Sequence, residues 1–315
     1  MNERIVFIGR NKNYQITQLC YQELVKYTQD TKHQAVLTVV SDDNHGSEGT
    51  LEALAENAGL SWTSVTNNDV NDPKFIQKLK KLNPTILITV QFPKIFKSDL
   101  IETPERACLN IHRGWPYRGG SIDERAIYFK LKTYNVILHH MSTGIDTGNI
   151  IGKEAIQLND TDDGFSLVKK ADEAGRKLFI ESFLPILGNP IPVSETQVIG
   201  ETVYGSKGSL SNVIAFTDSA ANIERLCRAF HHPRKMGAAI KVKSQYIFVI
   251  PPVEIISDST DVKPGTILSL AENKVVLATG DLMIAINKCH TGDKKPISFS
   301  EVLKGIKMGV GDCLV

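Results

Sequence analysis

The sequence has no long apolar run and almost no net charge. No stretch of about 18 consecutive apolar residues occurs, so no transmembrane helix is predicted. The start Met1-Asn2-Glu3-Arg4 leads into a short apolar stretch without the small-residue cleavage site of a signal peptide. The formal net charge is only +1, which excludes neither acidic nor basic partners. We therefore expect a cytoplasmic protein with no membrane partner.

Cysteine is scarce and dispersed. The five cysteines are Cys20, Cys108, Cys227, Cys289 and Cys313, and no two of them have the two-residue spacing of zinc or redox motifs. Two histidine pairs, His139-His140 and His231-His232, are adjacent in sequence, and neighbouring residues of a strand face opposite ways. We therefore predict buried thiols in a reducing compartment and no metal site.

The length and composition indicate two globular domains. A chain of 315 residues is long for one domain, and 42% hydrophobic with 23% charged residues is ordinary globular composition. A polar stretch punctuated by glycine and proline has no periodicity, which is typical of a linker. The predicted organisation is a domain over 1–198, a linker over 199–208 and a second domain over 209–315.

The N-terminal half alternates apolar strands with helices. Continuous apolar runs are typical of strands buried on both faces of a parallel sheet. Such runs occur at Ile5–Gly9, Ala35–Val40, Thr85–Val90 and Cys108–His112. Helix-like segments lie between them at Tyr14–Tyr27, Gly49–Ala58 and Pro73–Leu82, and extended runs at Asn135–Met141 and Asn149–Leu158 precede a helix at about Gly164–Leu187. This order predicts an α/β fold with an open, mostly parallel Rossmann-like sheet.

The C-terminal part reads as a helix followed by short strands. The helix is expected at Ser219–Phe230, and the strands at Ala239–Val242, Tyr246–Ile250, Thr266–Leu270, Lys274–Ala278 and Leu282–Ile286. Short strands at this spacing predict a small OB-like β-barrel. Residues 201–315 carry a net charge of +3, which gives only thin support to a nucleic-acid-binding barrel.

Polar residues that follow a buried strand are candidate site residues, because ligands of open α/β sheets bind at the carboxyl ends of strands. Asn110 and His112 lie at such an end, and two-residue spacing places them on one face, about 7 Å apart. An imidazole can move a proton, while a carboxamide can donate a hydrogen bond to an oxyanion. Asp146, in the turn Gly144-Ile145-Asp146-Thr147-Gly148, is the candidate carboxylate that orients the imidazole.

Structural alternatives compete with this interpretation. A histidine at a strand end is often only a structural residue, and the turn around Asp146 is also compatible with an aspartate that bonds its own backbone. The residues after the first strand, Ile8-Gly9-Arg10-Asn11-Lys12-Asn13, lack the Gly-x-Gly-x-x-Gly pattern, which argues against a dinucleotide.

The combination of motifs resembles the folate-dependent formyltransferase family. These motifs are Asn-x-His, a Pro-x-Arg-Gly loop, Arg-Ala-Ile and Gly-Ile-Asp-Thr-Gly. The family includes enzymes that formylate methionyl-tRNA, glycinamide ribonucleotide and nucleotide sugars. The resemblance implies that Asn110, His112 and Asp146 are catalytic. It also implies that backbone groups of Lys94, Ile95 and Phe96, and of Ser142, Thr143 and Gly144, contact the pterin ring of 10-formyltetrahydrofolate, with no metal.

The resemblance has departures that concern the acceptor. The loop after His112 is two residues shorter than usual in the family, and Ser41–Glu48 is acidic where tRNA enzymes carry a longer basic loop. Trp115, Tyr117 and Arg118 are therefore candidate residues for binding a sugar or base and a diphosphate. The alternative is that Trp115 and Tyr117 brace the loop while Arg118 pairs with Asp123.

The resulting hypothesis is transfer of a formyl group from 10-formyltetrahydrofolate to a primary amine, with the oxyanion held by Asn110 and His112. A nucleotide-linked amino sugar or similar small amine is favoured as acceptor, and methionyl-tRNA is the runner-up. A related hydrolase is disfavoured because the family resemblance would place an apolar residue at Asn110. A folate-binding protein without turnover is the alternative of another class. A homodimer is left open.

Overall fold

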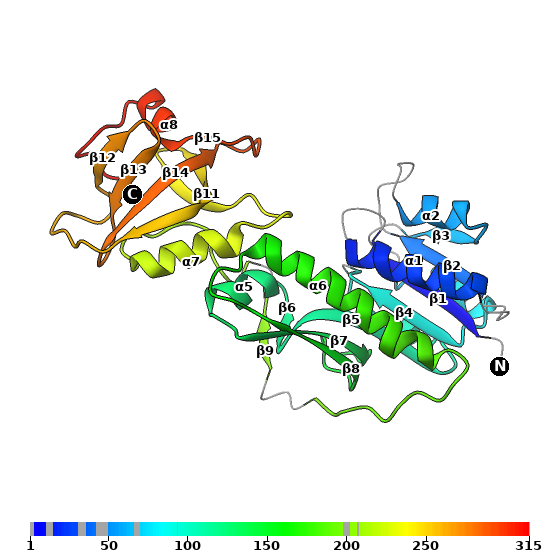
Figure 1. Cartoon of the computed structure of the whole chain (residues 1–315). Helices are drawn as coiled ribbons and strands as arrows, with labels where there is room; N and C mark the ends of the chain where they lie inside the picture. Colours follow the sequence, from blue (N-terminus) through cyan, green and yellow to red (C-terminus); the bar gives the residue numbers. More distant parts are fainter. Residues whose placement is uncertain are drawn as a thin grey trace. The chain divides into compact units, whose positions relative to one another are not determined.

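The structure of the chain is a computed structural model that describes residues 3–10, 15–30, 36–41, 50–65, 70–92, 94–197, 202–206 and 208–314. Its described residues form two compact units (Figure 1). The first comprises Met1–Gly119, Thr133–Gln157 and Lys169–Gly205, and the second comprises Gly120–Lys132, Leu158–Val168 and Ser206–Val315. The units are therefore interleaved along the sequence, and the predicted domain boundaries stay a prediction.

A seven-stranded sheet forms the centre of the first unit, in the order β3-β2-β1-β4-β5-β7-β8. The strands are β1 (Arg4–Gly9), β2 (Val36–Ser41), β3 (Trp62–Ser64), β4 (Ile86–Val90), β5 (Ala107–Trp115), β7 (Thr133–His140) and β8 (Ile150–Gln157). Pairing is parallel from β3 to β5 and antiparallel for β7 and β8. The predicted mostly parallel Rossmann-like sheet is confirmed.

Helices accompany the strands, and those that begin at Gln15, Leu51, Pro73 and Gly164 correspond to the helices that the sequence predicts. They are α1 (Gln15–Asp30), α2 (Leu51–Asn57), α3 (Pro73–Lys81), α4 (Ser98–Ile101), α5 (Ile122–Tyr128) and α6 (Gly164–Leu178). The start of α3 is fixed by Asp72, whose side chain accepts from the Lys74 amide at 2.7 Å, and by Pro73 in the first turn. Thr50 caps α2 by accepting from the Ala53 amide at 3.3 Å.

Strand β1 is buried on both faces, which explains its uninterrupted apolar sequence. Val6 and Ile8 belong to a core cluster that also contains Ile76 and Leu79 of α3. Phe7 faces the other way and meets Tyr21 of α1, with ring centroids 5.2 Å apart. Figure 1 shows α1 lying across β1 and its neighbours. A sheet covered on both faces leaves its strand ends as the accessible edge for a ligand.

The helix predicted over Gly164–Leu187 is shorter than expected. It is α-helical only to Leu178 and continues as a π-helical turn over Phe179–Phe183 and a 3-10 turn over Leu184–Ile186. Pro185 has no amide hydrogen to continue the α-helical ladder, so the helix cannot retain its geometry here. The amphipathic pattern alone did not reveal this change.

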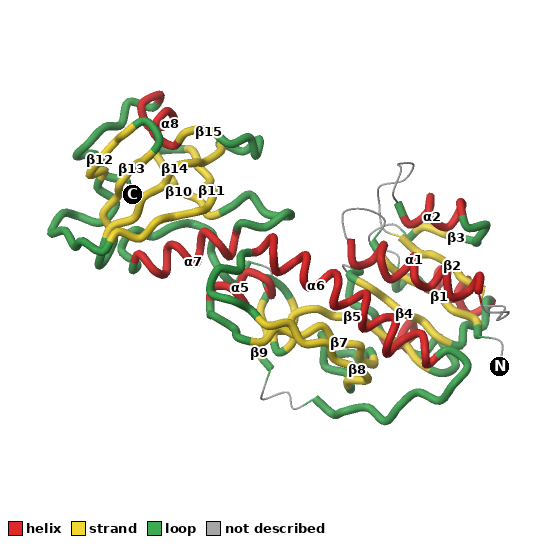
Figure 2. Tube along the Cα trace, viewed as in Figure 1, coloured by secondary structure: helices red, strands yellow, loops and turns green. Residues whose placement is uncertain are grey.

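The second unit contains an antiparallel sheet of six strands. These are β10 (Ala238–Val242), β11 (Gln245–Ile256), β12 (Ile267–Ala271), β13 (Lys274–Ala278), β14 (Met283–His290) and β15 (Ile297–Ser298). Helix α7 (Ala220–Phe230) packs against β11, and α8 (Phe299–Gly305) packs against β14 (Figure 2). The predicted C-terminal β domain is confirmed, with α8 and β15 as elements that the sequence did not predict.

All five cysteines are free thiols, and four of them are buried, with Cys313 half-buried. Burial raises the pKa of the Cys108 and Cys289 thiols to about 12, so neither is a reactive thiolate near neutral pH. Within the described ranges, no helix has the length and apolar character needed to cross a membrane.

Candidate active site

Strand β5 brings Asn110 and His112 to the carboxyl edge of the sheet. Asn110 pairs in register with Thr89 of β4, and Ile111 pairs with Val90, the last residue of that strand. His112 therefore lies just beyond the end of β4. Asn110 is half-buried and His112 is buried, with 8% of its surface exposed. Both sequence-predicted residues lie at the strand end where α/β sheets bind ligands.

Asp146 is held in a turn that follows β7. Its φ is +51°, in the left-handed region that aspartate tolerates better than most residues. The Gln197 amide donates to the Asp146 carbonyl at 3.3 Å and to the Gly148 carbonyl at 2.5 Å. The Gly119 amide donates to Asp146 Oδ2 at 3.2 Å. These contacts hold the backbone and the carboxylate of Asp146 in one orientation.

The turn packs tightly against β7. A Cβ atom built on Gly148 would lie 1.7 Å from the carbonyl oxygen of His140, so a side chain cannot be accommodated there without movement of the backbone. Ser142 Oγ and Thr147 Oγ1 are 2.7 Å apart and close the same turn. The glycine of the sequence motif is thus explained by a close approach of two backbone segments.

His112 and Asp146 face one another. His112 Nδ1 lies 3.4 Å from Asp146 Oδ2, and His112 Nε2 lies 3.0 Å from the Tyr117 carbonyl oxygen. A carbonyl oxygen can only accept, so Nε2 carries a proton that it donates to Tyr117. The other nitrogen, Nδ1, faces the Asp146 carboxylate at the distance of an ion pair. The two groups are therefore placed to take up and release a proton together.

His139 is a site residue that the sequence interpretation missed. Residue 139 is directly opposite Asn110 in the antiparallel pairing of β5 and β7, so their side chains lie on the same face. His139 Nε2 is 3.1 Å from Asn110 Nδ2 and 3.9 Å from Asp146 Oδ1. The side chain is nearly inaccessible, with 2% of its surface exposed. His139 thus completes a buried cluster with Asn110, His112 and Asp146.

The hydrogen bonds of His139 define its tautomer. Its Nδ1 lies 2.8 Å from the His140 carbonyl oxygen and must therefore carry the proton. Burial, partly opposed by the nearby Asp146 carboxylate, lowers the pKa of His139 to about 4. The ring is then neutral near pH 7, and its unprotonated Nε2 accepts from the Asn110 amide. This bond uses one N–H of Asn110, and the amide has a second N–H to donate.

A pH-dependent stability follows from His139. Its folded pKa lies below the usual 6.5, so its stability contribution is present above pH 6.5 and is lost as the pH falls toward 4, by about 3 kcal/mol. Glutamine can accept from Asn110 and donate to the His140 carbonyl without titrating. We expect His139→Gln to reduce the loss of unfolding free energy between pH 7 and pH 4.5, measured by urea denaturation. An unchanged pH dependence would contradict the buried, neutral ring.

The segment after His112 is not the loop that the sequence predicted. Strand β5 continues to Trp115, and β6 (Tyr117–Gly119) pairs in parallel with β9 (Val203–Gly205). The partner strand lies inside the segment predicted as a linker, and apolar periodicity could not reveal it because β9 has only three residues. The segment after His112 is therefore held by the backbone pairing of β6 with β9.

The three candidate acceptor-binding residues differ in their surroundings. Tyr117 is buried, with 8% of its surface exposed. Arg118 Nε donates to Thr202 Oγ1 at 2.7 Å, and its Nη1 donates to the Ile145 carbonyl at 3.0 Å, beside Asp146. Trp115 is half-buried, and Lys153 Nζ lies 4.5 Å from its ring centroid. The guanidinium of Arg118 thus braces the Asp146 turn, and the Trp115 ring is the candidate stacking surface.

The two candidate pterin loops are also ordered by internal contacts. The Asn71 amide donates to the Ile95 carbonyl at 2.9 Å, and its oxygen accepts from the Lys97 amide at 2.8 Å. Phe96 is buried in the core, while Ile95 is 60% exposed. Asn71 therefore fixes the backbone of the first loop. The second loop, Ser142 to Gly144, is the start of the Asp146 turn.

The remaining sequence candidates lie elsewhere. The acidic segment after Ser41 lies outside the described residues. His231 pairs with Asp163 at 2.6 Å, and His232 pairs with Asp123 at 3.1 Å. Among the described residues, no group of three or more His, Cys, Asp and Glu side chains is arranged to hold a metal ion.

Two family models match the sequence of this chain. The Formyl transferase family model matches residues 3–183, and the model of the formyl transferase C-terminal domain matches residues 211–307. A methionyl-tRNA formyltransferase from Caldicellulosiruptor saccharolyticus is 27% identical over 248 residues, covering 76% of this chain and 77% of the relative.

Two solved structures have the same fold. An N-formyltransferase from Helicobacter canadensis, in complex with folinic acid and dTDP-3-aminofucose, has a TM-score of 0.69 at 18% identity, covering 91% of this chain and all of the other. HypX from Aquifex aeolicus, in complex with tetrahydrofolic acid, has a TM-score of 0.62 at 15% identity, covering 98% of this chain and 48% of HypX. With the family model matching more than half of its length, this chain belongs to the formyl transferase family.

Proposed function

We propose that the protein transfers a formyl group from 10-formyltetrahydrofolate to a primary amine. The observation that carries this proposal is the cluster of Asn110, His112, His139 and Asp146 at the carboxyl edge of the sheet, in which an amide N–H and a His–Asp pair lie together. The tetrahydrofolic acid and folinic acid bound to the two structural relatives support a folate as donor.

The reaction needs one stabilised oxyanion and one proton transfer. The amine nitrogen attacks the formyl carbon, a C–N bond forms, and the carbonyl oxygen becomes an oxyanion that accepts from the amide of Asn110. The amine loses a proton to the His112–Asp146 pair, and the same pair returns it to N10 of the folate as the C–N10 bond breaks. The products are a formamide and tetrahydrofolate, so atoms and charge balance.

His112 contributes to proton transfer more directly than to oxyanion binding. Its Nε2–H donates to the Tyr117 carbonyl in the structure, so contact with the oxyanion requires this proton to leave that acceptor. Its Nδ1 already faces Asp146. We therefore assign the oxyanion chiefly to Asn110 and the proton to the His112–Asp146 pair.

We infer a small amine acceptor, such as a nucleotide-linked amino sugar. The net charge of +3 over residues 201–315 is low for a surface that follows a polyanion, and Ser41–Glu48 carries no Lys or Arg. The half-buried Trp115 ring offers a stacking surface for a sugar or base. The dTDP-3-aminofucose held by the Helicobacter canadensis relative supports this class, whereas the sequence relatives favour methionyl-tRNA as the second candidate.

A comparison of acceptors tests this proposal. The purified protein and 10-formyltetrahydrofolate are incubated with a panel of nucleoside-diphosphate amino sugars or with methionyl-tRNA at one salt concentration, and formylated product is quantified by mass spectrometry. We expect sugar formylation with a weak dependence on salt. Efficient tRNA formylation with a steep salt dependence and no sugar product would reverse the acceptor assignment. Folate binding without loss of the formyl group to any amine would favour a binding protein.

A further inference from the structure

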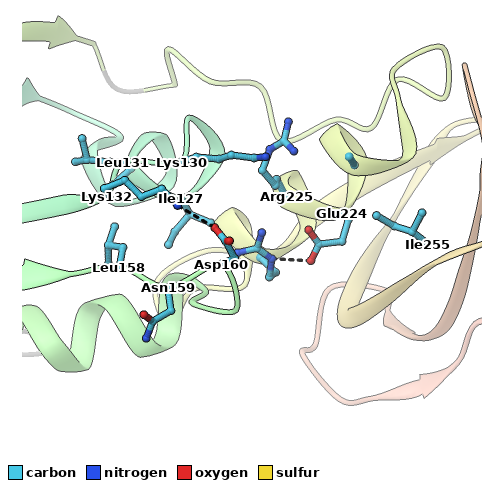
Figure 3. Close-up of a pocket in the computed structure, with 13 residues that line it drawn as sticks. Ile127, Lys130, Leu131, Lys132, Leu158, Asn159, Asp160, Glu224, Arg225 and Ile255 are labelled. Carbon is cyan, nitrogen blue, oxygen red and sulfur yellow. Dashed lines mark hydrogen bonds and ion pairs between the residues drawn. The ribbon is translucent and has the colours of Figure 1, made fainter.

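The second unit contains a cavity that formyl transfer does not use. It lies between α5, the segment after β8 and α7, and has a volume of about 270 Å³ (Figure 3). Its wall includes apolar side chains and four basic side chains. The basic residues are Lys130, Lys132, Arg225 and Arg228. Such a combination of apolar surface and a few polar groups is typical of a small-molecule site.

Two of the four basic side chains are paired with acids of the same wall. Lys132 Nζ lies 3.3 Å from Asp160 Oδ1, and Arg228 Nε lies 2.6 Å from Glu224 Oε1. Arg228 Nη1 also donates to the Asp162 carbonyl at 2.6 Å. Each pair joins one basic and one acidic side chain of the wall. Asp160 and Glu224, the two acidic residues that line the cavity, are both used in these pairs.

The other two basic side chains have no acidic partner in the described part of the chain. Arg225 Nη2 donates to Asn222 Oδ1, while Arg225 Nε is buried and has no hydrogen-bond partner among the described residues. In Figure 3 the Lys130 side chain extends from the segment after α5 toward Arg225 of α7. Lys130 is exposed, so water screens its charge, whereas the buried Arg225 N–H without an acceptor costs free energy. An anion that accepts from Arg225 removes this cost, and Lys130 adds a second positive charge beside it.

The apolar side chains of the cavity wall limit the kind of anion. Hydrocarbon surface in the same wall is provided by Ile127, Leu131, Leu158 and Ile255. A fully hydrated inorganic ion gains nothing from this surface, whereas an apolar or aromatic group attached to the anion does. The guanidinium also matches the oxygens of a phosphate better than a point charge does.

We propose that this cavity binds a small phosphorylated molecule, with the phosphate held by Arg225 and Lys130 and an apolar body against Ile127, Leu131 and Leu158. The site belongs to the second unit alone and is independent of the proposed formyl acceptor. Its ligand is a phosphate ester or diphosphate with a compact apolar group.

Isothermal titration calorimetry on the full-length protein tests the site, with phenyl phosphate, inorganic pyrophosphate and inorganic phosphate as probes at constant ionic strength. We expect saturable binding of phenyl phosphate at least several-fold tighter than that of inorganic phosphate. Arg225→Gln and Lys130→Gln should each weaken it by about tenfold or more. Lys132→Gln is the matched control, because it removes the same charge from the same wall but from a paired lysine, and should change affinity less than about threefold.

The outcomes separate this cavity from the formyl-transfer site. Formyl transfer rates of Arg225→Gln and Lys130→Gln should equal those of the wild type. No saturable binding of any probe at millimolar concentration would overturn the proposal. Equal affinity in the wild type and in both variants would also overturn it, because the phosphate would then bind elsewhere.

Discussion

Replacing Asp146 by Asn is expected to lower kcat for formyl transfer by about 10²–10⁴-fold, and His112→Asn should do the same. The carboxylate lies 3.4 Å from His112 Nδ1 and accepts from the Gly119 amide, so the neutral amide keeps the shape of the turn but cannot hold the proton that the amine loses. Single-turnover transfer of an isotopically labelled formyl group, followed by mass spectrometry, measures the effect without interference from product release.

Asp163→Asn is the matched control for this substitution. Asp163 pairs with His231 at 2.6 Å in the second unit, so the variant removes a His–Asp pair of the same kind away from the cluster. It should transfer formyl groups at close to the wild-type rate. Thermal denaturation should show that all three variants are folded. Wild-type turnover by Asp146→Asn would remove Asp146 from the mechanism.

Asn110→Ala should lower kcat by about 10²–10³-fold, the usual cost of losing one oxyanion donor. The His139 Nε2 atom accepts one N–H of Asn110, so the amide is already oriented before the substrate binds, and its loss is not replaced by another donor of the cluster. The affinity for 5-formyltetrahydrofolate, a non-reactive analogue, should change little because the interaction forms as the oxyanion develops.

Asn212→Ala provides the comparison for Asn110. The Asn212 amide donates to the Gly237 carbonyl at 2.9 Å within the second unit, so this variant also loses an asparagine that donates a hydrogen bond. Its kcat should stay near that of the wild type. If Asn110→Ala lost folate affinity in proportion to kcat, Asn110 would be a binding residue and the oxyanion would need another donor.

Much of the fold could be predicted because local patterns and tertiary burial agree. The run from Ile5 to Gly9 is apolar at every position because both faces of β1 are covered, and a strand at 274–278 was predicted with its observed bounds. The parts of the fold that the sequence did not predict have local causes. Strand β9 has three residues and is defined by its partner β6, and the end of α6 depends on Pro185 within an otherwise helical pattern.

Three residues of the candidate site could be predicted because local sequence patterns identify them. Asn110 and His112 could be identified together because their spacing along one strand fixes their common face, and Asp146 because of its turn motif. His139 could be identified only from the register of β5 against β7, which aligns it with Asn110. Successive side chains of a strand lie on opposite faces of the sheet. For this reason His139 and His140 are a poor pair for a metal ion, and only His139 lies in the cluster. The contacts of Arg118 with Thr202 and Ile145 depend on long-range packing, so the sequence could not reveal them, and its part in binding a diphosphate stays a prediction.

The most direct test of the mechanism is the single-turnover rate of the double variant His112→Asn/Asp146→Asn beside both single variants. If the two residues handle one proton as a unit, removal of either disables the pair, and the double variant should be within a few-fold of the slower single variant. If the two losses multiply, each residue acts alone, and transfer of one proton by the His112–Asp146 pair is contradicted.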